Sequence, residues 1–237
     1  MTFKKFFSYF LLTFGFALGS CSGDEPELLG SFHKSALRLS VNPDQALASV
    51  GSSSAKSSES GIALPTVGEF MVSFTPAGQS EPEAAYRYDE MPEIITLPVG
   101  DYTVAATCGA NPAAAWNAPY FTGQINVSVN SDDVVIANPI VCTIANIRVT
   151  TVFDESIAAA NISDPKVELS ANGVTIGVTP AEAAAGSIFV APTGEPITAT
   201  FRGKLNGSPV TATHTVASPL PTHHYRITFR YDSQIHD

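Results

Sequence analysis

Apolar residues recur at every second position along most of this chain, and almost nowhere with the spacing of an amphipathic helix. Because successive side chains of a strand point to opposite faces, this alternation predicts strands with one buried face. The fold class expected is therefore all-β. The clearest alternating sets in the first half are Leu37/Leu39/Val41, Phe70/Val72/Phe74, Tyr102/Val104/Ala106/Cys108 and Ile125/Val127/Val129.

The alternation slips by one residue near Ala145 and Asn146. The two sets that flank the slip are Ile140/Cys142/Ile144 and Ile147/Val149/Thr151/Phe153. A shift of one residue turns every side chain to the opposite face of a sheet, so we expect a bulge or a change of sheet here. Prolines between the strand candidates favour short strands in sandwiches. We therefore predict two tandem β-sandwiches, an N-terminal one over residues 30–145 and a C-terminal one over residues 146–237.

Two Asn-Gly pairs in the second half predict tight hairpins. Asn172-Gly173 separates the apolar segments 167–169 and 174–176, and Asn206-Gly207 separates 197–205 from 210–216. Both residues of such a pair accept the positive φ angles of a type I′ turn. The segment from Tyr225 to Tyr231 alternates most cleanly of all and should form a half-buried final strand.

The N-terminus has the features of a signal peptide. Lys4 and Lys5 precede an apolar run from Phe6 to Leu18, which is too short to span a bilayer and ends at Cys21. The residues Leu18-Gly19-Ser20-Cys21 resemble the lipobox of bacterial lipoproteins. The resemblance implies that residues 1–20 are removed and that acyl chains on Cys21 anchor the protein in a membrane.

The segment after the cysteine, residues 21–29, is acidic. It resembles the tether that directs Bacteroidetes lipoproteins to the outer face of the outer membrane, so we expect a surface-exposed protein. The formal net charge is −10, and loss of Lys4 and Lys5 makes it −12. Such a charge argues against a nucleic-acid partner. A second polar segment, residues 49–61, contains seven serines and is expected to be a flexible loop.

The two other cysteines, Cys108 and Cys142, form an even pair in an exported chain, which permits one disulfide. Each shares parity with core-facing neighbours. They could therefore meet inside one sandwich, either bonded to each other or as two buried thiols, and the sequence leaves both alternatives open.

No arrangement of residues in the sequence points to catalysis, a metal or a cofactor. There is no Gly-x-Ser-x-Gly elbow, and Cys108 lies on the apolar side of its strand. His223 and His224 are adjacent, so in a strand they point to opposite faces and cannot share one ion, with or without His214. We expect a protein that is not an enzyme.

The strongest candidate for ligand contact is the aromatic segment that contains Trp116, Tyr120 and Phe121. Flat aromatic side chains in a loop can stack on sugars or on partner proteins. The alternative is that these rings close one end of a sandwich.

Three segments together resemble a family. They are Tyr88–Ala106, which includes Leu97-Pro98-Val99-Gly100-Asp101-Tyr102, the aromatic segment Trp116–Gly123, and Cys142–Val149. They are similar to a Bacteroidetes lipoprotein family of unknown function (domain of unknown function number forty-four ninety-three), which resembles the fimbrillin-like adhesins. The resemblance implies two transthyretin-like β-sandwiches and attachment to glycans or surface proteins without catalysis. A glycan-binding lipoprotein for polysaccharide capture is the alternative.

Overall fold

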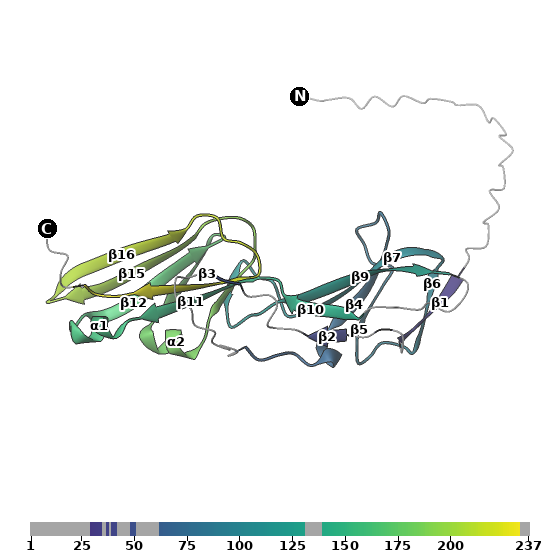
Figure 1. Cartoon of the computed structure of the whole chain (residues 1–237), viewed down its shortest axis with the longest axis horizontal. Coiled ribbons are helices and arrows are strands. Elements are labelled where there is room, and N and C mark those ends of the chain that lie inside the picture. Colours follow the sequence, from purple (N-terminus) through teal and green to yellow (C-terminus); the bar gives the residue numbers. More distant parts are fainter. Residues whose placement is uncertain are drawn as a thin grey trace, which may run out of the picture.

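The computed structural model describes residues 29–34, 37, 39–41, 48–50, 62–130 and 139–232, with residues 48–50 described as backbone. The signal peptide, Cys21, residues 22–28 of the tether and residues 51–61 of the serine-rich loop lie outside the described residues. Strands dominate what is described, which confirms the all-β class. Figure 1 shows two β-structured bodies that follow one another along the longest axis of the molecule.

The first body consists of a six-stranded sheet and a two-stranded sheet. The six-stranded sheet has the order β2-β10-β9-β7-β4-β5, and β1 pairs with β6. The bounds are β1 (Leu29–His33), β2 (Leu39–Val41), β4 (Met71–Pro76), β5 (Ala84–Arg87), β6 (Ile94–Pro98), β7 (Gly100–Cys108), β9 (Phe121–Val129) and β10 (Ile140–Ile144), with a short 3-10 helix at Val67–Glu69.

The core of this body follows the alternation of the sequence. Val72 and Phe74 of β4 and Val104 of β7 are fully buried, whereas the residues between them are at least partly exposed. The rings of Phe32 and Phe74 meet edge to face with 4.9 Å between their centroids, so the two-stranded sheet is packed against the six-stranded one.

The second body contains a five-stranded and a four-stranded sheet, with the orders β3-β17-β11-β14-β8 and β13-β12-β15-β16. Their core lies between them. The bounds are β3 (Ala48–Val50), β8 (Ala114–Trp116), β11 (Ile147–Phe153), β12 (Ser163–Ala171), β13 (Val174–Val178), β14 (Ile188–Val190), β15 (Ile197–Leu205), β16 (Ser208–Val216) and β17 (His223–Phe229), and the helices are α1 (Glu155–Ala159) and α2 (Pro180–Ala185).

Both predicted hairpins are confirmed. Asn172 and Gly173 join β12 to β13 with φ angles of 49° and 76°, and Asn206 and Gly207 join β15 to β16 with 51° and 81°. Two positive φ angles in succession define the type I′ turn that suits the twist of a hairpin. The last strand, β17, buries Tyr225, Ile227 and Phe229 as its alternation predicts.

The slip at Ala145 and Asn146 corresponds to a change of sheet, which is one of the two structures that the sequence predicts there. The strand before it, β10, belongs to the six-stranded sheet of the first body, and β11 belongs to the five-stranded sheet of the second. The boundary itself stays a prediction, because the chain crosses between the bodies more than once. β8 and β3, which the predicted boundary assigns to the first sandwich, are hydrogen-bonded into the sheet of the second.

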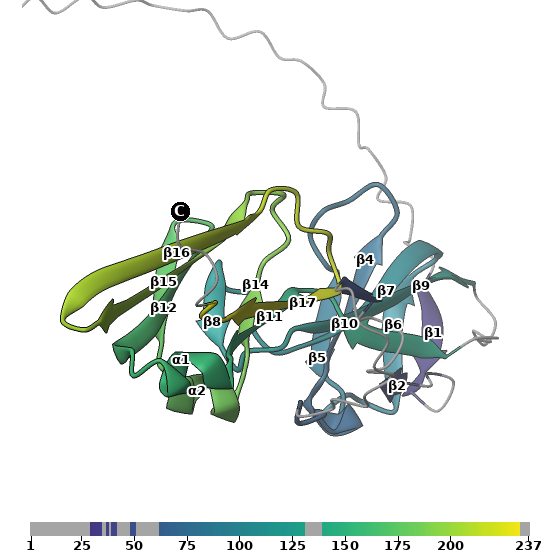
Figure 2. The ribbon, with the colours of Figure 1, turned by 60° about the vertical axis from the view of Figure 1, so that its left-hand side comes forward.

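These crossings join the two bodies along the length of the molecule. Phe189 of β14, a strand of the second body, packs into the first core and is 2% exposed. Figures 1 and 2 show β1 at one end, and α1 with the neighbouring ends of β12 and β15 at the opposite end. Within the described ranges, no helix is both long enough and apolar enough to cross a membrane.

Candidate functional site

The aromatic segment does not form one exposed platform. Phe121, the first residue of β9, is 2% exposed and belongs to the first core. Trp116 is half-buried, pairs with Ile188 of β14 and packs against the second core. Tyr120 between them is also half-buried. The burial of Phe121 favours the alternative that these rings close one end of a sandwich, and contact of the segment with a ligand stays a prediction.

A buried asparagine holds this segment in place. Asn146 is fully buried; its Nδ2 donates to the carbonyl oxygen of Ala118 at 3.0 Å, and its Oδ1 accepts from the backbone N–H of Tyr120 at 3.3 Å. The N–H of Ala145 donates to the carbonyl oxygen of Tyr120 at 2.8 Å. The residue at which the chain changes sheet therefore also fixes the aromatic segment.

A second asparagine ties the same segment to the second body. Asn117 has a φ angle of 50° and makes two hydrogen bonds with Ser187. The Asn117 N–H donates to the carbonyl oxygen of Ser187 at 2.9 Å, and the Ser187 N–H donates to Asn117 Oδ1 at 3.0 Å. A Cβ atom on Gly186 would lie 2.3 Å from Asn117 Oδ1, so any larger residue there would displace the Asn117 side chain. Neither asparagine was recognised from the sequence, although Asn146 occupies the parity slip.

The two cysteines are free thiols. They lie on β7 and β10, which flank β9 in the six-stranded sheet, so roughly 10 Å separates the two backbones. A disulfide requires Cα atoms within about 7 Å of each other. Burial raises the pKa of Cys142 to about 11 and also raises that of Cys108. Neither thiol is therefore poised as a thiolate nucleophile at neutral pH.

The histidines of β17 point to opposite sides of their strand, as expected. The His223 ring stacks near Tyr225 on the core side with 6.3 Å between centroids. His224 Nε2 lies 2.9 Å from Thr150 Oγ1 of β11 on the other side. Within the described part of the chain, no group of three His, Cys, Asp or Glu side chains could hold a metal ion.

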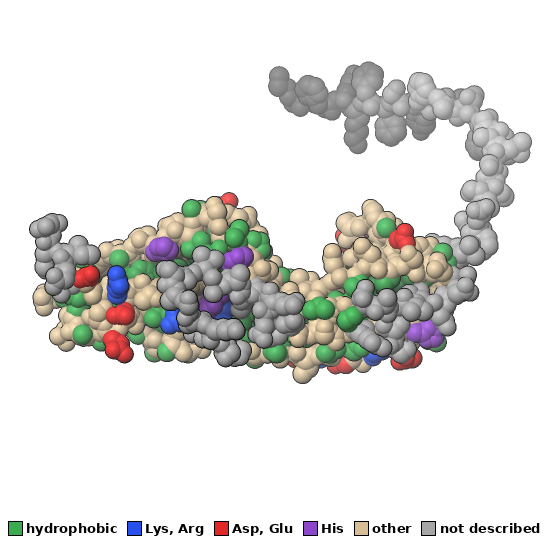
Figure 3. All heavy atoms as spheres, in the orientation of Figure 1, with side chains coloured by type: hydrophobic (Ala, Val, Ile, Leu, Met, Phe, Trp, Pro, Cys, Tyr) green, Lys and Arg blue, Asp and Glu red, His purple; other side chains and the backbone are tan. Residues whose placement is uncertain are grey.

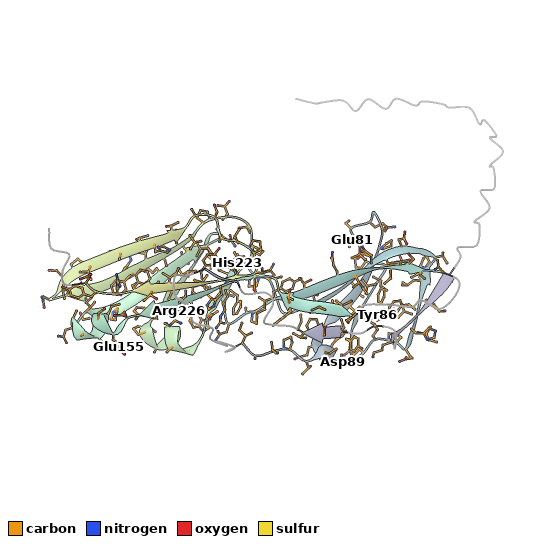
Figure 4. All side chains as sticks on the ribbon, in the orientation of Figure 1. Glu81, Tyr86, Asp89, Glu155, His223 and Arg226 are labelled. Carbon is orange, nitrogen blue, oxygen red and sulfur yellow. The ribbon has the colours of Figure 1, made fainter. Side chains whose placement is uncertain are left out.

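The side of β11 and β17 that faces away from the core forms a pocket with α2. The pocket has a volume of about 470 Å³ and contains two arginines but no carboxylate among its lining side chains. Figure 4 shows Arg226 on the side of the sheet where α2 lies. The residues that line it are Arg148, Thr150, Thr151, Val152, Phe153, Pro180, Ala183, Ala184, Ala185, Gly186, Ser187 and Arg226.

A polar network runs through this pocket. Arg148 is 8% exposed, and its Nε donates to Ser187 Oγ at 2.9 Å. Ser187 Oγ lies 3.0 Å from Thr150 Oγ1, which also meets His224. Guanidinium and hydroxyl groups together recognise oxyanions such as carboxylate and sulfate. The pocket is thus a candidate binding site for the anionic group of a ligand, although the net charge of the protein is negative.

Alternation alone places Arg148, Thr150 and Arg226 of the pocket on the solvent side of their strands, and the sequence analysis did not single out these three residues. Helix α2 covers them because a capping box starts it, in which the Thr179 N–H donates to the Glu182 carboxylate at 2.8 Å. The segment Thr179-Pro180-Ala181-Glu182 was a signal that could have predicted this helix.

Comparison with family models identifies the chain. The model of the domain of unknown function DUF4493 matches residues 34–235. The chain belongs to this family. Among curated proteins, no match to this DUF4493 chain was found.

Solved structures from Bacteroides and Parabacteroides resemble this DUF4493 chain. A candidate cell adhesion protein from Bacteroides thetaiotaomicron is 13% identical, with a TM-score of 0.37, over 84% of this chain and 92% of that chain. A fimbrial assembly protein from Parabacteroides distasonis is 9% identical, with a TM-score of 0.41, over 71% and 85%. Candidate polysaccharide-binding proteins from Bacteroides thetaiotaomicron are 12% identical, with a TM-score of 0.40, over 70% and 84%.

Proposed function

We propose that this chain is a non-catalytic lipoprotein of the outer membrane surface that serves an adhesive or structural role. Cys21 carries the anchor in this proposal, and the second body is the part held away from the membrane. The observation that supports it most is the placement of the ends. Leu29, where the described chain begins, lies in β1 at one end of the elongated molecule, and α1 lies at the other (Figure 1).

The junction between the bodies is suited to a structural role. A flexible linker would let the second body swing freely, but here two strands, a buried asparagine and the packing of Phe189 into the first core connect the bodies. Because several independent contacts must break together, the junction resists bending under force. A rigid stem suits a protein that presents its outer end for attachment.

The outer end carries exposed side chains of both charges. Glu155 of α1 lies there in Figure 4, and Lys204 donates to Asp164 Oδ2 at 3.0 Å. The Asn206-Gly207 turn lies at the same end, because Lys204, two residues before it, pairs with Ser163, which begins the strand after α1. Contacts with another surface would be made by this end.

The anchor is tested by Cys21→Ala. Without the acylated cysteine we expect the protein to move from the membrane fraction to the soluble fraction, because the described residues contain no helix able to span a bilayer. Cells that display the unchanged protein should be retained on a mucin-coated surface, and cells with Cys21→Ala should not.

The exposed end provides the control for this experiment. Ser208→Cys on otherwise unchanged protein should react with a membrane-impermeant maleimide on intact cells, because Ser208 is exposed at the outer end. Membrane retention of Cys21→Ala, or no labelling of Ser208→Cys on intact cells, would contradict the proposal.

A second candidate function, glycan capture, is supported by the two-arginine pocket rather than by the aromatic segment. Trp116 pairs with Ile188, whose side chain is buried in the second core, so the tryptophan lies on the core side of the sheet and outside the pocket. Arg148, Arg226 and Ser187 would instead recognise the carboxylate of an acidic sugar. We propose a uronic-acid oligosaccharide as the ligand class for this reading.

Arg226→Gln tests glycan capture. Charge-assisted hydrogen bonds contribute roughly 1.5–3 kcal/mol, so the substitution should weaken binding of a uronic-acid oligosaccharide about tenfold or more. Calorimetric titration measures the affinity. Arg202→Gln is the matched control, since Arg202 is exposed on β15 and donates to Glu168 at 2.8 Å far from this pocket. Equal affinities of the two variants, or no saturable binding by the unchanged protein, would exclude this reading.

A further inference from the structure

The strand β16 forms one edge of the four-stranded sheet. It runs for nine residues and pairs along its whole length with β15, from Leu205↔Ser208 to Ile197↔Val216. Among the described strands it has no second neighbour. Its outer side therefore presents backbone N–H and C=O groups that can pair with another strand. Figure 2 shows β16 along the outer margin of the second body.

The sequence of β16 lacks the usual protection of an edge. Natural edge strands carry lysine or other charges, or a central proline, which prevent strand addition. Between Ser208 and Val216 there is no Lys, Arg, Asp or Glu, and Pro209 is the second residue rather than a central one. The other edge of this sheet, β13, has only five residues.

The middle of the strand is also exposed on both faces. Ala212 and His214 pair with the buried residues Phe201 and Ala199, so they lie on the core side of the sheet, yet both are exposed. The second core therefore leaves the middle of β16 uncovered, whereas Val210 and Val216 near its ends are half-buried against that core. An added strand would find room on both faces.

We propose that β16 pairs antiparallel with β16 of a second copy of this chain, which joins two four-stranded sheets into one continuous sheet. A two-fold axis at Thr213 places Thr213 opposite itself and Thr211 opposite Thr215 of the other copy. The same axis places Val210 opposite Val216. Threonine therefore faces threonine and valine faces valine, Ala212 faces His214, and no Lys, Arg, Asp or Glu lies within the paired segment.

The existing sheet already shows the pattern that this pairing continues. On the outer face of β15 and β16, the hydroxyl groups of Thr198 and Thr215 are 3.2 Å apart, and those of Thr200 and Thr213 are 3.3 Å apart. A second copy would extend these rows of threonines across the two-fold axis. β-Branched cross-strand pairs of this kind stabilise sheets.

The test is the oligomeric state of the mature chain with Cys21→Ala, so that no acyl chain contributes. Sedimentation velocity over a dilution series should show a dimer that dissociates to monomers. Thr213→Lys places two like charges opposite each other, and we expect it to raise the dissociation constant at least tenfold. Thr175→Lys, exposed on β13 of the same sheet, is the matched control and should leave the dimer unchanged.

A second variant reports the register directly. Thr213→Cys should form a disulfide-linked dimer under mild oxidation, because residues directly opposite in an antiparallel pair have Cα atoms about 4.5–5.5 Å apart. Thr175→Cys should not. A monomer for the unchanged chain at all concentrations, or a dimer that Thr213→Lys leaves intact, would overturn the proposal. Because neither measurement involves membranes or attachment, failure here is distinguishable from failure of the adhesive role.

Discussion

Phe121→Ala is expected to lower the free energy of unfolding by about 3 to 5 kcal/mol, the range for truncating a buried phenylalanine. Phe121 is 2% exposed and pairs with Cys108 on one side and Ile144 on the other, so its ring is packed within the first core. The loss of the ring removes apolar burial and leaves a cavity beside the junction. Urea denaturation of the mature chain with Cys21→Ala measures the change.

The neighbouring tyrosine is the control. Tyr120 is half-buried, and its contacts with Asn146 and Ala145 are made by backbone atoms that alanine retains. Tyr120→Ala should therefore cost clearly less than Phe121→Ala. If Phe121→Ala instead leaves stability unchanged and abolishes binding to a glycan or a partner, the ring serves recognition and its assignment to the core is wrong.

Asn146→Ala is expected to lower the free energy of unfolding by about 2 to 3 kcal/mol. The substitution leaves the N–H of Tyr120 and the carbonyl of Ala118 without their partner, and each lost partner of a buried polar group costs about 1–3 kcal/mol. The cost of each lost hydrogen bond lies below the top of this range, because the N–H of Tyr120 and the carbonyl of Ala118 are in partly buried positions. The same denaturation measurement applies.

Asn126→Ala provides the comparison for Asn146→Ala. Asn126 lies on β9, and its Oδ1 accepts from Thr103 Oγ1 at 3.1 Å in an exposed position. Water replaces such a bond, so we expect a change within about 0.5 kcal/mol. A similar loss for both variants would mean that the junction contributes no more to stability than the surface does.

The alternation of the sequence predicted the strands that have a long, half-buried pattern. It also predicted both Asn-Gly hairpins, whose backbone conformation depends on two residues and not on the rest of the fold. It could not assign β3 and β8 to the second body. Each has three residues, too few for a period, and their partners β17 and β14 lie far away in the sequence.

The candidate site was harder to predict for a related reason. Trp116, Tyr120 and Phe121 are close in sequence, but the segment crosses between the two cores. Phe121 therefore belongs to the first core, whereas Trp116 packs against the second. Arg148 has the parity of a solvent-facing residue, and only the fold shows that α2 covers it. The local alternation predicts toward which face of a strand a side chain points. What covers that face depends on segments that are distant in the sequence.

The distribution of charge on the surface is also a property of the fold. Figure 3 shows acidic and basic side chains as scattered groups on the visible face, with most of that surface uncharged. Glu168 is flanked by Lys166 and Arg202, whose hydrogen bonds lower its pKa to about 2. Neither edge strand of this sheet, β13 or β16, contains a Lys, Arg, Asp or Glu, so its charged side chains lie on the two central strands.

The direction of β16 determines whether two paired molecules can belong to the same cell. The strand lies roughly along the long axis of the protein, and Leu29 lies at one end of that axis (Figure 1). A two-fold axis perpendicular to the sheet reverses this direction, so the anchors proposed at Cys21 would lie at opposite ends of the pair. Such a pair could not form between neighbours standing upright on one membrane, but it would bridge two facing bacteria.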